Sequence, residues 1–252
     1  MKAVVLSDIH LGYENSEVEA FRAFLDELPD IQPDYFIICG DFIEMWRRDM
    51  VAPVLEYCDI LAKLKELNRQ MSVILIAGNH DWHVMRMGRP LETYPPPFQF
   101  KEVFSIHMDG FYYSFKHGHQ YDPLCRHPRP NNSLCYTPED TTRLEPGHLV
   151  SWFRGKEPML QLHGYIPRIS RRRILDPGYI SKMPALIDVV RWRARISRHA
   201  NEFLIHGHTH SPLLDTEGMY ADTGCWVDGS RDYLLIEDNV VSLLQYESTT
   251  HR

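Results

Sequence analysis

Five short motifs in this sequence carry side chains that could bind metal ions: Asp8-Ile9-His10, Gly40-Asp41, Gly78-Asn79-His80-Asp81, His117-Gly118-His119 and Gly207-His208-Thr209-His210. Four of them follow short apolar runs and one follows an aromatic-rich run, as expected after buried strands. Because tight loops at strand ends present ligand-binding residues in open α/β sheets, we expect these side chains to converge on one rim. The seven expected metal ligands are Asp8, His10, Asp41, Asn79, His117, His208 and His210.

Carboxylates, imidazoles and one amide oxygen form the mixture of ligands that a site for two close divalent cations requires. Two cations about 3.5–4 Å apart lower the pKa of a bridging water and clamp phosphoryl oxygens, so the expected reaction is phosphoester hydrolysis. Oxygen and imidazole ligands suit Mn, Fe or Zn, and the lack of cysteine at these positions argues against a structural zinc site. We expect two divalent ions, Mn²⁺ first, with Fe or Zn as alternatives.

Each motif taken alone has a simpler structural interpretation. Asp8-x-His10 is typical of a turn or a helix cap, and Gly40-Asp41 is typical of a strand-to-helix turn. Gly78–Asp81 alone indicates a turn, and a single His-x-His is compatible with a surface pair. The combination of all five motifs, each placed after a strand-like run, favours a functional site.

The five motifs together resemble the calcineurin-like metallophosphoesterase superfamily, from residue 3 to about residue 230. Residues 6–11, 40–46 and 205–212 more narrowly resemble the UDP-2,3-diacylglucosamine pyrophosphohydrolases of lipid A synthesis. The resemblance implies an α/β (α+β) fold: a four-layer αββα sandwich of two mixed β-sheets flanked by helices, with a partly helical cap. It also implies hydrolysis of a phosphoester or pyrophosphate bond in a small phosphorylated or amphiphilic substrate, such as a nucleotide-linked sugar or lipid.

The superfamily pattern also implies roles for individual residues. The first metal is assigned to Asp8, His10, Asp41 and His210, and Asp41 bridges to a second metal on Asn79, His117 and His208. The expected catalytic residues are His80 as general acid or phosphate stabiliser, Glu44 as the residue that orients it, and Asp81. The lipid A enzymes carry Arg where this chain has His80, which leaves open a relative that acts on another substrate.

Charge is distributed unevenly along the chain. Residues 168–198 hold nine basic and two acidic residues, a net +7, which leaves −14 for the rest of a chain whose net charge is −7. The negative total disfavours binding of extended nucleic acid, which depends on phosphate neutralisation. Within the basic segment, Arg171, Arg172 and Arg173 are candidates for substrate binding. The segment could contact phosphate or an anionic membrane surface, or form a solvated face, and both interpretations stay open.

Length and composition bound the domain organisation. The 252 residues, 44% of them hydrophobic, predict a single domain over residues 1–252 with a cap insertion at about 122–200. No apolar run approaches the ~20 residues that cross a bilayer, and the N-terminus lacks signal-peptide features, so a cytoplasmic protein is expected. The alternatives to the two-metal hydrolase are a nuclease or general phosphodiesterase of the same superfamily, and a non-catalytic metal-binding scaffold.

Hydrophobic periodicity predicts the elements that position the motifs. Strands are predicted at 2–6, 35–39 and 72–77, and they alternate with helices from a capping box at 16–19 to Pro29 and over 53–68. A second, largely antiparallel sheet is predicted from 103–107, 111–116, 203–206, 219–222, 233–237 and 240–245. A helix is predicted over 183–200, and a stiff proline-rich connection over 90–98.

Overall fold

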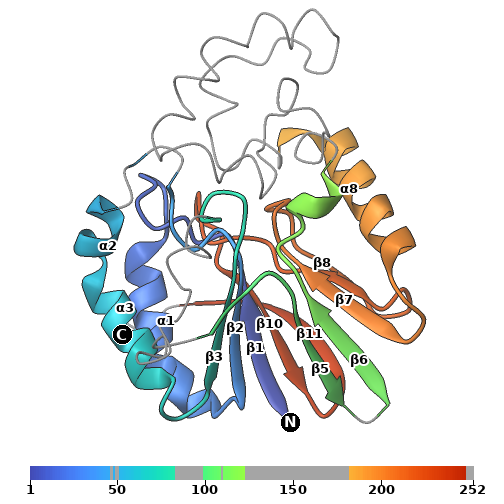
Figure 1. The fold of residues 1–252 in the computed structure, drawn as a ribbon, viewed down its shortest axis with the longest axis horizontal. Coiled ribbons are helices and arrows are strands. Elements are labelled where there is room, and N and C mark those ends of the chain that lie inside the picture. Colours follow the sequence, from blue (N-terminus) through green and yellow to red (C-terminus); the bar gives the residue numbers. More distant parts are fainter. Residues whose placement is uncertain (46–47, 49–50, 83–98, 109, 123–181, 248–252) are drawn as a thin grey trace, which may run out of the picture.

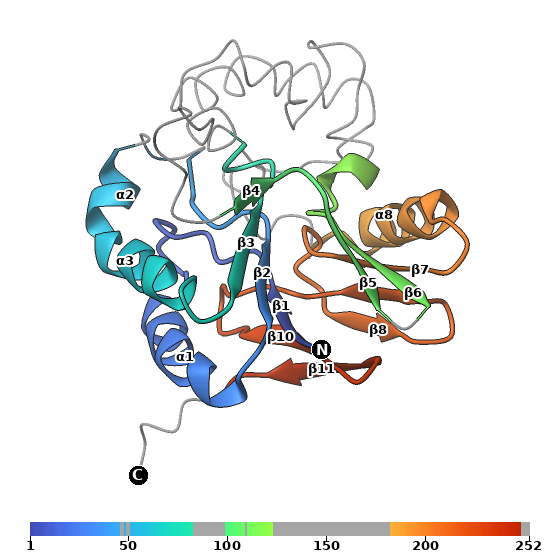
Figure 2. The same ribbon diagram turned by 60° about the horizontal axis from the view of Figure 1, so that its bottom comes forward.

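Two β-sheets pack face to face and helices cover their outer sides, so the chain forms four layers (Figure 1). The computed structural model describes residues 1–45, 48, 51–82, 99–108, 110–122 and 182–247. The first sheet is covered by α1 (Val18–Ile31), α2 (Ala52–Glu56) and α3 (Cys58–Leu67), and the second by α8 (Pro184–Ser197) (Figure 2). The predicted sandwich of two mixed sheets with flanking helices is therefore confirmed.

The first sheet is parallel in its centre and antiparallel at one side. Its strands are β1 (Lys2–Leu6), β2 (Tyr35–Cys39), β3 (Ser72–Ile76), β4 (Gln99–Lys101), β10 (Asp232–Glu237) and β11 (Val240–Gln245). They lie in the order β11-β10-β1-β2-β3-β4. Strands β1 to β4 are parallel to one another, β10 is antiparallel to β1, and β11 is antiparallel to β10. The nearly continuous apolar sequences of β1, β2 and β3 suit a parallel sheet that is covered on both faces.

The second sheet is also mixed. Its strands are β5 (Phe104–Met108), β6 (Phe111–Phe115), β7 (Glu202–His206), β8 (Leu213–Asp215) and β9 (Tyr220–Asp222), in the order β5-β6-β7-β9-β8. The three central strands β6, β7 and β9 are parallel, and the two edge strands are antiparallel to their neighbours. A short 3₁₀ helix, η1 (His119–Tyr121), follows β6. The carboxyl ends of β6 and β7 therefore lie at the same edge of this sheet.

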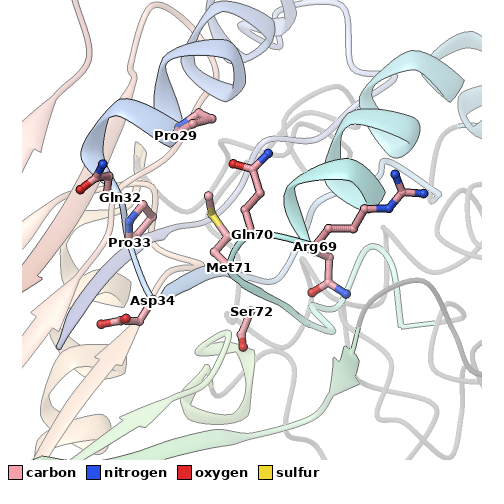
Figure 3. A pocket seen from close by; sticks show the side chains of 9 residues that line it. Pro29, Gln32, Pro33, Asp34, Arg69, Gln70, Met71 and Ser72 are labelled. Atoms are coloured by element: carbon pink, nitrogen blue, oxygen red, sulfur yellow. The ribbon is translucent and has the colours of Figure 1, made fainter.

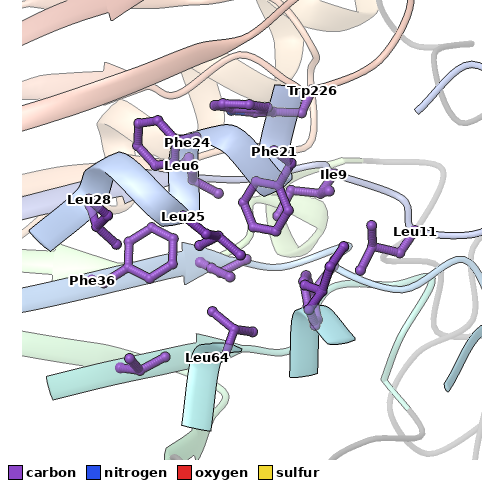
Figure 4. Packing of buried hydrophobic residues seen from close by; sticks show 14 of the residues in the cluster. Leu6, Ile9, Leu11, Phe21, Phe24, Leu25, Leu28, Phe36, Leu64 and Trp226 are labelled. Carbon is purple, nitrogen blue, oxygen red and sulfur yellow. The ribbon is translucent and has the colours of Figure 1, made fainter. Parts of the chain in front are cut away.

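The two faces of the first sheet bury different cores. Along β1, Val4 and Leu6 pack into the core beneath the helices, whereas Ala3 and Val5 pack into the core between the sheets, as the two-residue period of a strand requires. Figure 4 shows the helix-side core, in which Phe24 of α1 lies beside Trp226. Large side chains buried on both faces hold the strand ends in fixed positions, which a site assembled from several loops needs.

Two predictions about the strands were wrong. The strands at 233–237 and 240–245 join the first sheet and not the second, because β10 pairs with the outer edge of β1, with Val4 opposite Leu235. The second sheet is not largely antiparallel, since β6 to β7 is a parallel connection. A parallel connection needs a long crossover, and the interval between residues 116 and 201, which contains α8, supplies it. The short strands β4 and β8 were not predicted.

Three predictions about the helices also need correction. The capping box is wrong: Glu17 is the N-cap of α1 and makes no side-chain cap bond, and the Ser16 hydroxyl donates to the carbonyl of Ile9 instead. Helix α1 continues past Pro29 to Ile31. The helix predicted over 53–68 is divided at Tyr57, whose φ of −114° and ψ of 28° interrupt it. The proline-rich connection at 90–98 lies outside the described residues.

Candidate metal centre

The five motifs meet at the carboxyl ends of parallel strands from both sheets. Loops after β1, β2 and β3 carry the first three motifs, and loops after β6 and β7 carry the other two. Backbone hydrogen bonds join the loops: Asp8 N donates to Gly40 O at 3.0 Å, and Gly207 N donates to His117 O at 2.8 Å. The expected convergence of the seven side chains on one rim agrees with this arrangement.

Five of the seven expected ligands have left-handed backbone, which is rare for residues other than glycine. Their φ values are 56° at Asp8, 50° at His10, 50° at Asp41, 71° at His208 and 54° at His210. Each such conformation costs about 1–3 kcal/mol and persists where the surrounding structure enforces it, often at functional sites. The concentration of strain at these positions supports a site whose geometry is built into the fold.

The first group of ligand atoms comes from Asp8, His10 and His210, which are all buried and lie within 4.8 Å of one another. Oδ1 of Asp8 lies 3.1 Å from Nε2 of His210 and 3.8 Å from Nε2 of His10. The other oxygen of Asp8, Oδ2, accepts hydrogen bonds from the Ser7 hydroxyl and from His208 N. Within the described residues, no hydrogen bond is made to the buried Oδ1, which leaves this oxygen available to bind a cation.

The second group of ligand atoms comes from Asp41, His117 and His208, again within 4.8 Å. Nδ1 of His117 lies 2.8 Å from the carbonyl oxygen of Cys39 and must be the donor, because a carbonyl only accepts. This leaves Nε2 of His117 facing Oδ1 of Asn79 at 3.0 Å and Oδ2 of Asp41 at 3.3 Å. A nitrogen and two oxygens that converge in this way are a suitable set of ligands for a divalent cation.

Asp41 belongs to the second group, and its carboxylate also lies within 4.8 Å of ligand atoms of His10 and His80. His80 N donates to Oδ1 of Asp41 at 2.9 Å, which engages that oxygen. Oδ2 of Asp41 lies 3.3 Å from Nε2 of His117 and 3.7 Å from Nε2 of His10. One carboxylate oxygen is thus shared between histidines that belong to different ligand groups.

The charges around the rim favour a cation. Burial alone would lower the pKa of His117, but Asp41 and Asp8 raise it to about 9. Burial likewise opposes the charged form of His10, yet Asp8 and Glu44 raise its pKa to about 9. Conversely, His210 and His117 hold the pKa of Asp8 well below its usual range against the effect of burial. Buried carboxylates here stabilise positive charge on the facing imidazoles, and a divalent cation would supply the same charge.

The expected catalytic residues lie beside this rim, in different arrangements. Oε2 of Glu44 accepts from Nδ1 of His80 at 2.9 Å and from Nδ1 of His10 at 3.2 Å, while Nε2 of His80 lies 3.9 Å from Oδ2 of Asp41. The carboxylate of Asp81 instead accepts backbone hydrogen bonds, from Gly78 N and from Phe42 N, both at 2.7 Å. Its described contacts therefore join two site loops. Burial raises the pKa of Asp81 to about 6, and the nearby charge of Asp41 adds to this effect.

The motifs do not indicate two further residues that contact the expected ligands. Asp122 is fully buried, and its Oδ2 lies 3.0 Å from Nε2 of His208. Ser7 donates to Asp8 and also lies 2.6 Å from Thr223 Oγ1. Ser7 directly precedes the first motif, so its position in the sequence could have indicated that it belongs to the site. Asp122 follows an expected ligand by five residues in an irregular stretch, and nothing in the sequence indicated it.

The described part of the basic segment packs against its own sheet. Arg191 donates to the carbonyl of Ser211 at 2.7 Å, and Arg195 donates to Asp215 at 2.8 Å and lies over the ring of Tyr220. Arg191 thus holds α8 next to the loop that follows His210, and Arg195 holds it next to β8 and β9. The candidate substrate-binding residues Arg171, Arg172 and Arg173, and most of the cap at 122–200, lie outside the described residues.

A concave pocket of about 560 Å³ lies at the opposite end of the first sheet (Figure 3). Its lining includes Asp34 and Ser72, at the amino ends of β2 and β3, and Arg69 after α3. The expected metal ligands all follow carboxyl ends of strands, so this pocket is separate from the site.

In the described part of the chain, no helix combines the length and the hydropathy that spanning a membrane requires.

Residues 1–212 match the family described as calcineurin-like phosphoesterase. The chain is 25% identical over 227 residues to a UDP-2,3-diacylglucosamine hydrolase of Shewanella sp. (strain W3-18-1), covering 89% of this chain and 86% of that protein. It is 26% identical over 265 residues to the enzyme of that name from Shewanella baltica (strain OS185), covering 99% and 100%. A solved phosphoesterase from E. coli is 16% identical, with a TM-score of 0.48 over 99% of this chain and 100% of that one.

Proposed function

Because this chain belongs to the calcineurin-like phosphoesterase family, we propose that it hydrolyses a phosphoester or pyrophosphate bond with two divalent metal ions at the rim. The observation that carries the proposal is the position of Oδ2 of Asp41, 3.3 Å from Nε2 of His117 and 3.7 Å from Nε2 of His10. One oxygen between two histidines of different ligand groups is the geometry expected of a bridging carboxylate.

Asp8, His10 and His210 would hold the first ion, and Asn79, His117 and His208 the second, with Asp41 common to both. When bound, two such ions lower the pKa of a water molecule and offset the charge of phosphoryl oxygens. Oxygen and imidazole ligands suit Mn²⁺ first, and Fe or Zn also fit.

His80 has the geometry of a proton donor beside the reacting phosphate. Glu44 accepts from Nδ1 of His80, which keeps the proton of that nitrogen in place and turns Nε2 toward Asp41. Because Nδ1 keeps its proton, Nε2 would donate to a phosphoryl oxygen or to the leaving group from the imidazolium form of His80. Glu44 would act through His80 and His10, and Asp81 would hold the loops of Asp41 and Asn79 together.

The named relatives support a substrate class. Proteins similar over nearly the whole chain are called UDP-2,3-diacylglucosamine hydrolases, so the proposed substrate is a pyrophosphate that joins a nucleotide to a sugar or lipid. His80 favours a second candidate, a phosphodiesterase of the same family with another substrate, because the lipid A pattern has Arg at this position.

Metal content and turnover of one variant test the proposal. Wild-type protein loaded with Mn²⁺ should hold two ions per chain and hydrolyse either a nucleotide-linked sugar pyrophosphate or a generic phosphodiester such as bis(p-nitrophenyl) phosphate. Asp41→Ala should lose most of both ions and its turnover, because a bridging ligand serves both. The matched control is Asp59→Ala, which removes an exposed carboxylate paired with Arg22. Unchanged metal content in Asp41→Ala would reject the two-metal assignment.

A further inference from the structure

Each of three expected ligand histidines has one ring nitrogen anchored by a buried oxygen. Nδ1 of His10 donates to Glu44 at 3.2 Å, and Nδ1 of His117 donates to the Cys39 carbonyl at 2.8 Å. Nε2 of His208 lies 3.0 Å from Oδ2 of Asp122. Such outer partners of metal-binding histidines select the tautomer and the ring orientation, and they raise the basicity of the other nitrogen.

In His208 the ring nitrogen held by the buried oxygen is Nε2, whereas in His10 and His117 it is Nδ1. Because its Nε2 faces the carboxylate of Asp122, Nδ1 is the nitrogen left for the ligand group that it shares with Asp41 and His117. The backbone of His208 is held as well, since its N donates to Oδ2 of Asp8 at 2.9 Å and its φ is 71°. Both ends of the residue are therefore restrained, one by Asp8 and the other by Asp122.

The position of Asp122 is set by a compact turn. Tyr121 N donates to Gly118 O at 2.9 Å and Asp122 N donates to His119 O at 3.1 Å, which forms the short 3₁₀ helix η1, separated from the end of β6 by three residues. Gly118 has a φ of 116°, and a Cβ at this position would lie 2.7 Å from the ring of His206, so the turn requires glycine. Tyr121 is buried beside the ring of His206. Asp122 is thus presented to His208 from a packed element.

The charge of the site supports the same assignment. Two divalent cations bring four positive charges, whereas the expected ligands include the carboxylates of Asp8 and Asp41 alone. Glu44 adds a buried carboxylate beside His10, on the side of the first ion, and Asp122 adds a buried carboxylate beside His208, on the side of the second. Each expected ion would thus have one further buried carboxylate next to one of its histidines.

We propose that Asp122 is a positioning residue for the second metal ion, acting through the imidazole of His208. The inference rests on the proposed function, because it assumes that His208 binds an ion. It assigns to Asp122 the role toward His208 that Glu44 has toward His10. Loss of such an outer partner typically weakens metal binding by about 10–100-fold.

The test is a Mn²⁺ titration of metal-free wild type, Asp122→Ala and Asp122→Asn, with Asp59→Ala as the control. Wild type and the control should bind two ions. Asp122→Ala should bind one ion with unchanged affinity and the other about 10–100-fold more weakly. Asp122→Asn, which keeps the shape and an acceptor oxygen, should show a smaller loss. At intermediate Mn²⁺ concentrations, electron paramagnetic resonance of Asp122→Ala should show the signal of a single Mn²⁺ ion, where wild type shows that of a coupled pair.

Anomalous scattering from crystals at a fixed Mn²⁺ concentration should place the loss beside Asn79 and His117. Two ions at wild-type affinity in folded Asp122→Ala would overturn the inference and leave the proposed function intact. If Asp122→Ala does not fold, wild-type affinity in Asp122→Asn would overturn it equally. Wild type that binds fewer than two ions would instead reject the proposed function, and the inference with it.

Discussion

The backbone N–H of His80 donates a 2.9 Å hydrogen bond to Oδ1 of Asp41. The loop that carries the expected proton donor therefore also orients the expected bridging ligand. With Oδ1 engaged, Oδ2 of Asp41 is the oxygen that faces the histidines of both ligand groups. A change in the loop after β3 should consequently affect the metals even where no ligand is replaced.

Gly78→Ala tests this coupling. A Cβ at Gly78 would lie 2.0 Å from Oδ1 and 2.4 Å from the backbone N of Asp41, so one of the two loops must move. We expect a loss of most bound Mn²⁺ and a decrease in stability of about 1–3 kcal/mol from overpacking. Elemental analysis and thermal unfolding measure the two effects.

Gly110→Ala is the matched control for Gly78→Ala. Its added Cβ would meet no heavy atom within 4 Å, although the φ of 89° makes alanine unfavourable there. We expect a stability loss of about 1 kcal/mol, with full metal content. Equal metal loss in both variants would show that general destabilisation, and not displacement of Asp41, removes the ions.

His80→Ala separates proton donation from metal binding. His80 is outside the seven-ligand set, and its Nδ1 is held by Glu44 at 2.9 Å. Removal of a positioned acid typically costs about 10²–10⁴ in rate, so kcat should fall by that factor while metal content stays at the wild-type value. Near-normal turnover, or loss of the metals, would contradict the role proposed for His80.

Metal removal should lower the thermal stability of the protein. An ion that binds the folded state at about 100 times its Kd adds about 2.7 kcal/mol, which corresponds to roughly 5–10 °C in Tm for a chain of this size. Chelation with EDTA should therefore lower Tm, and added Mn²⁺ should restore it. Asp41→Ala serves as the control and should respond to neither treatment. A wild-type Tm that does not depend on Mn²⁺ would argue against tight binding at the rim.

Replacing Arg171, Arg172 and Arg173 together by Ala tests the basic segment, whose structure at these positions lies outside the described residues. If these arginines bind an anionic substrate through bidentate contacts, KM for a nucleotide-linked lipid or sugar should rise. Turnover of bis(p-nitrophenyl) phosphate should stay almost unchanged, because the metal centre is untouched. Equal effects on both substrates, or none, would favour a solvated face. Binding to anionic vesicles by the same variant tests peripheral membrane association.

The site could be predicted from the sequence because its side chains lie in short motifs. Asp8, Asp41 and His117 each follow a strand that could be recognised from its apolar or aromatic run, and residues at the ends of parallel strands must share an edge. The residue types alone indicated divalent cations, since carboxylates and imidazoles are their usual ligands. The family resemblance and the layered fold rested on the same motifs.

Tertiary structure decided the features that depend on pairing between distant segments. The place of β10 beside β1, and not in the second sheet, depends on which edge each strand meets, and hydrophobic alternation is the same in both cases. The contact between Asp122 and His208 joins residues 86 positions apart, and no local pattern encodes it. The left-handed backbone of Asp8, His10 and Asp41 likewise arises from packing that overrides local preference. Sequence therefore determined which chemistry the chain carries, and the packing of two sheets decided which oxygen faces which histidine.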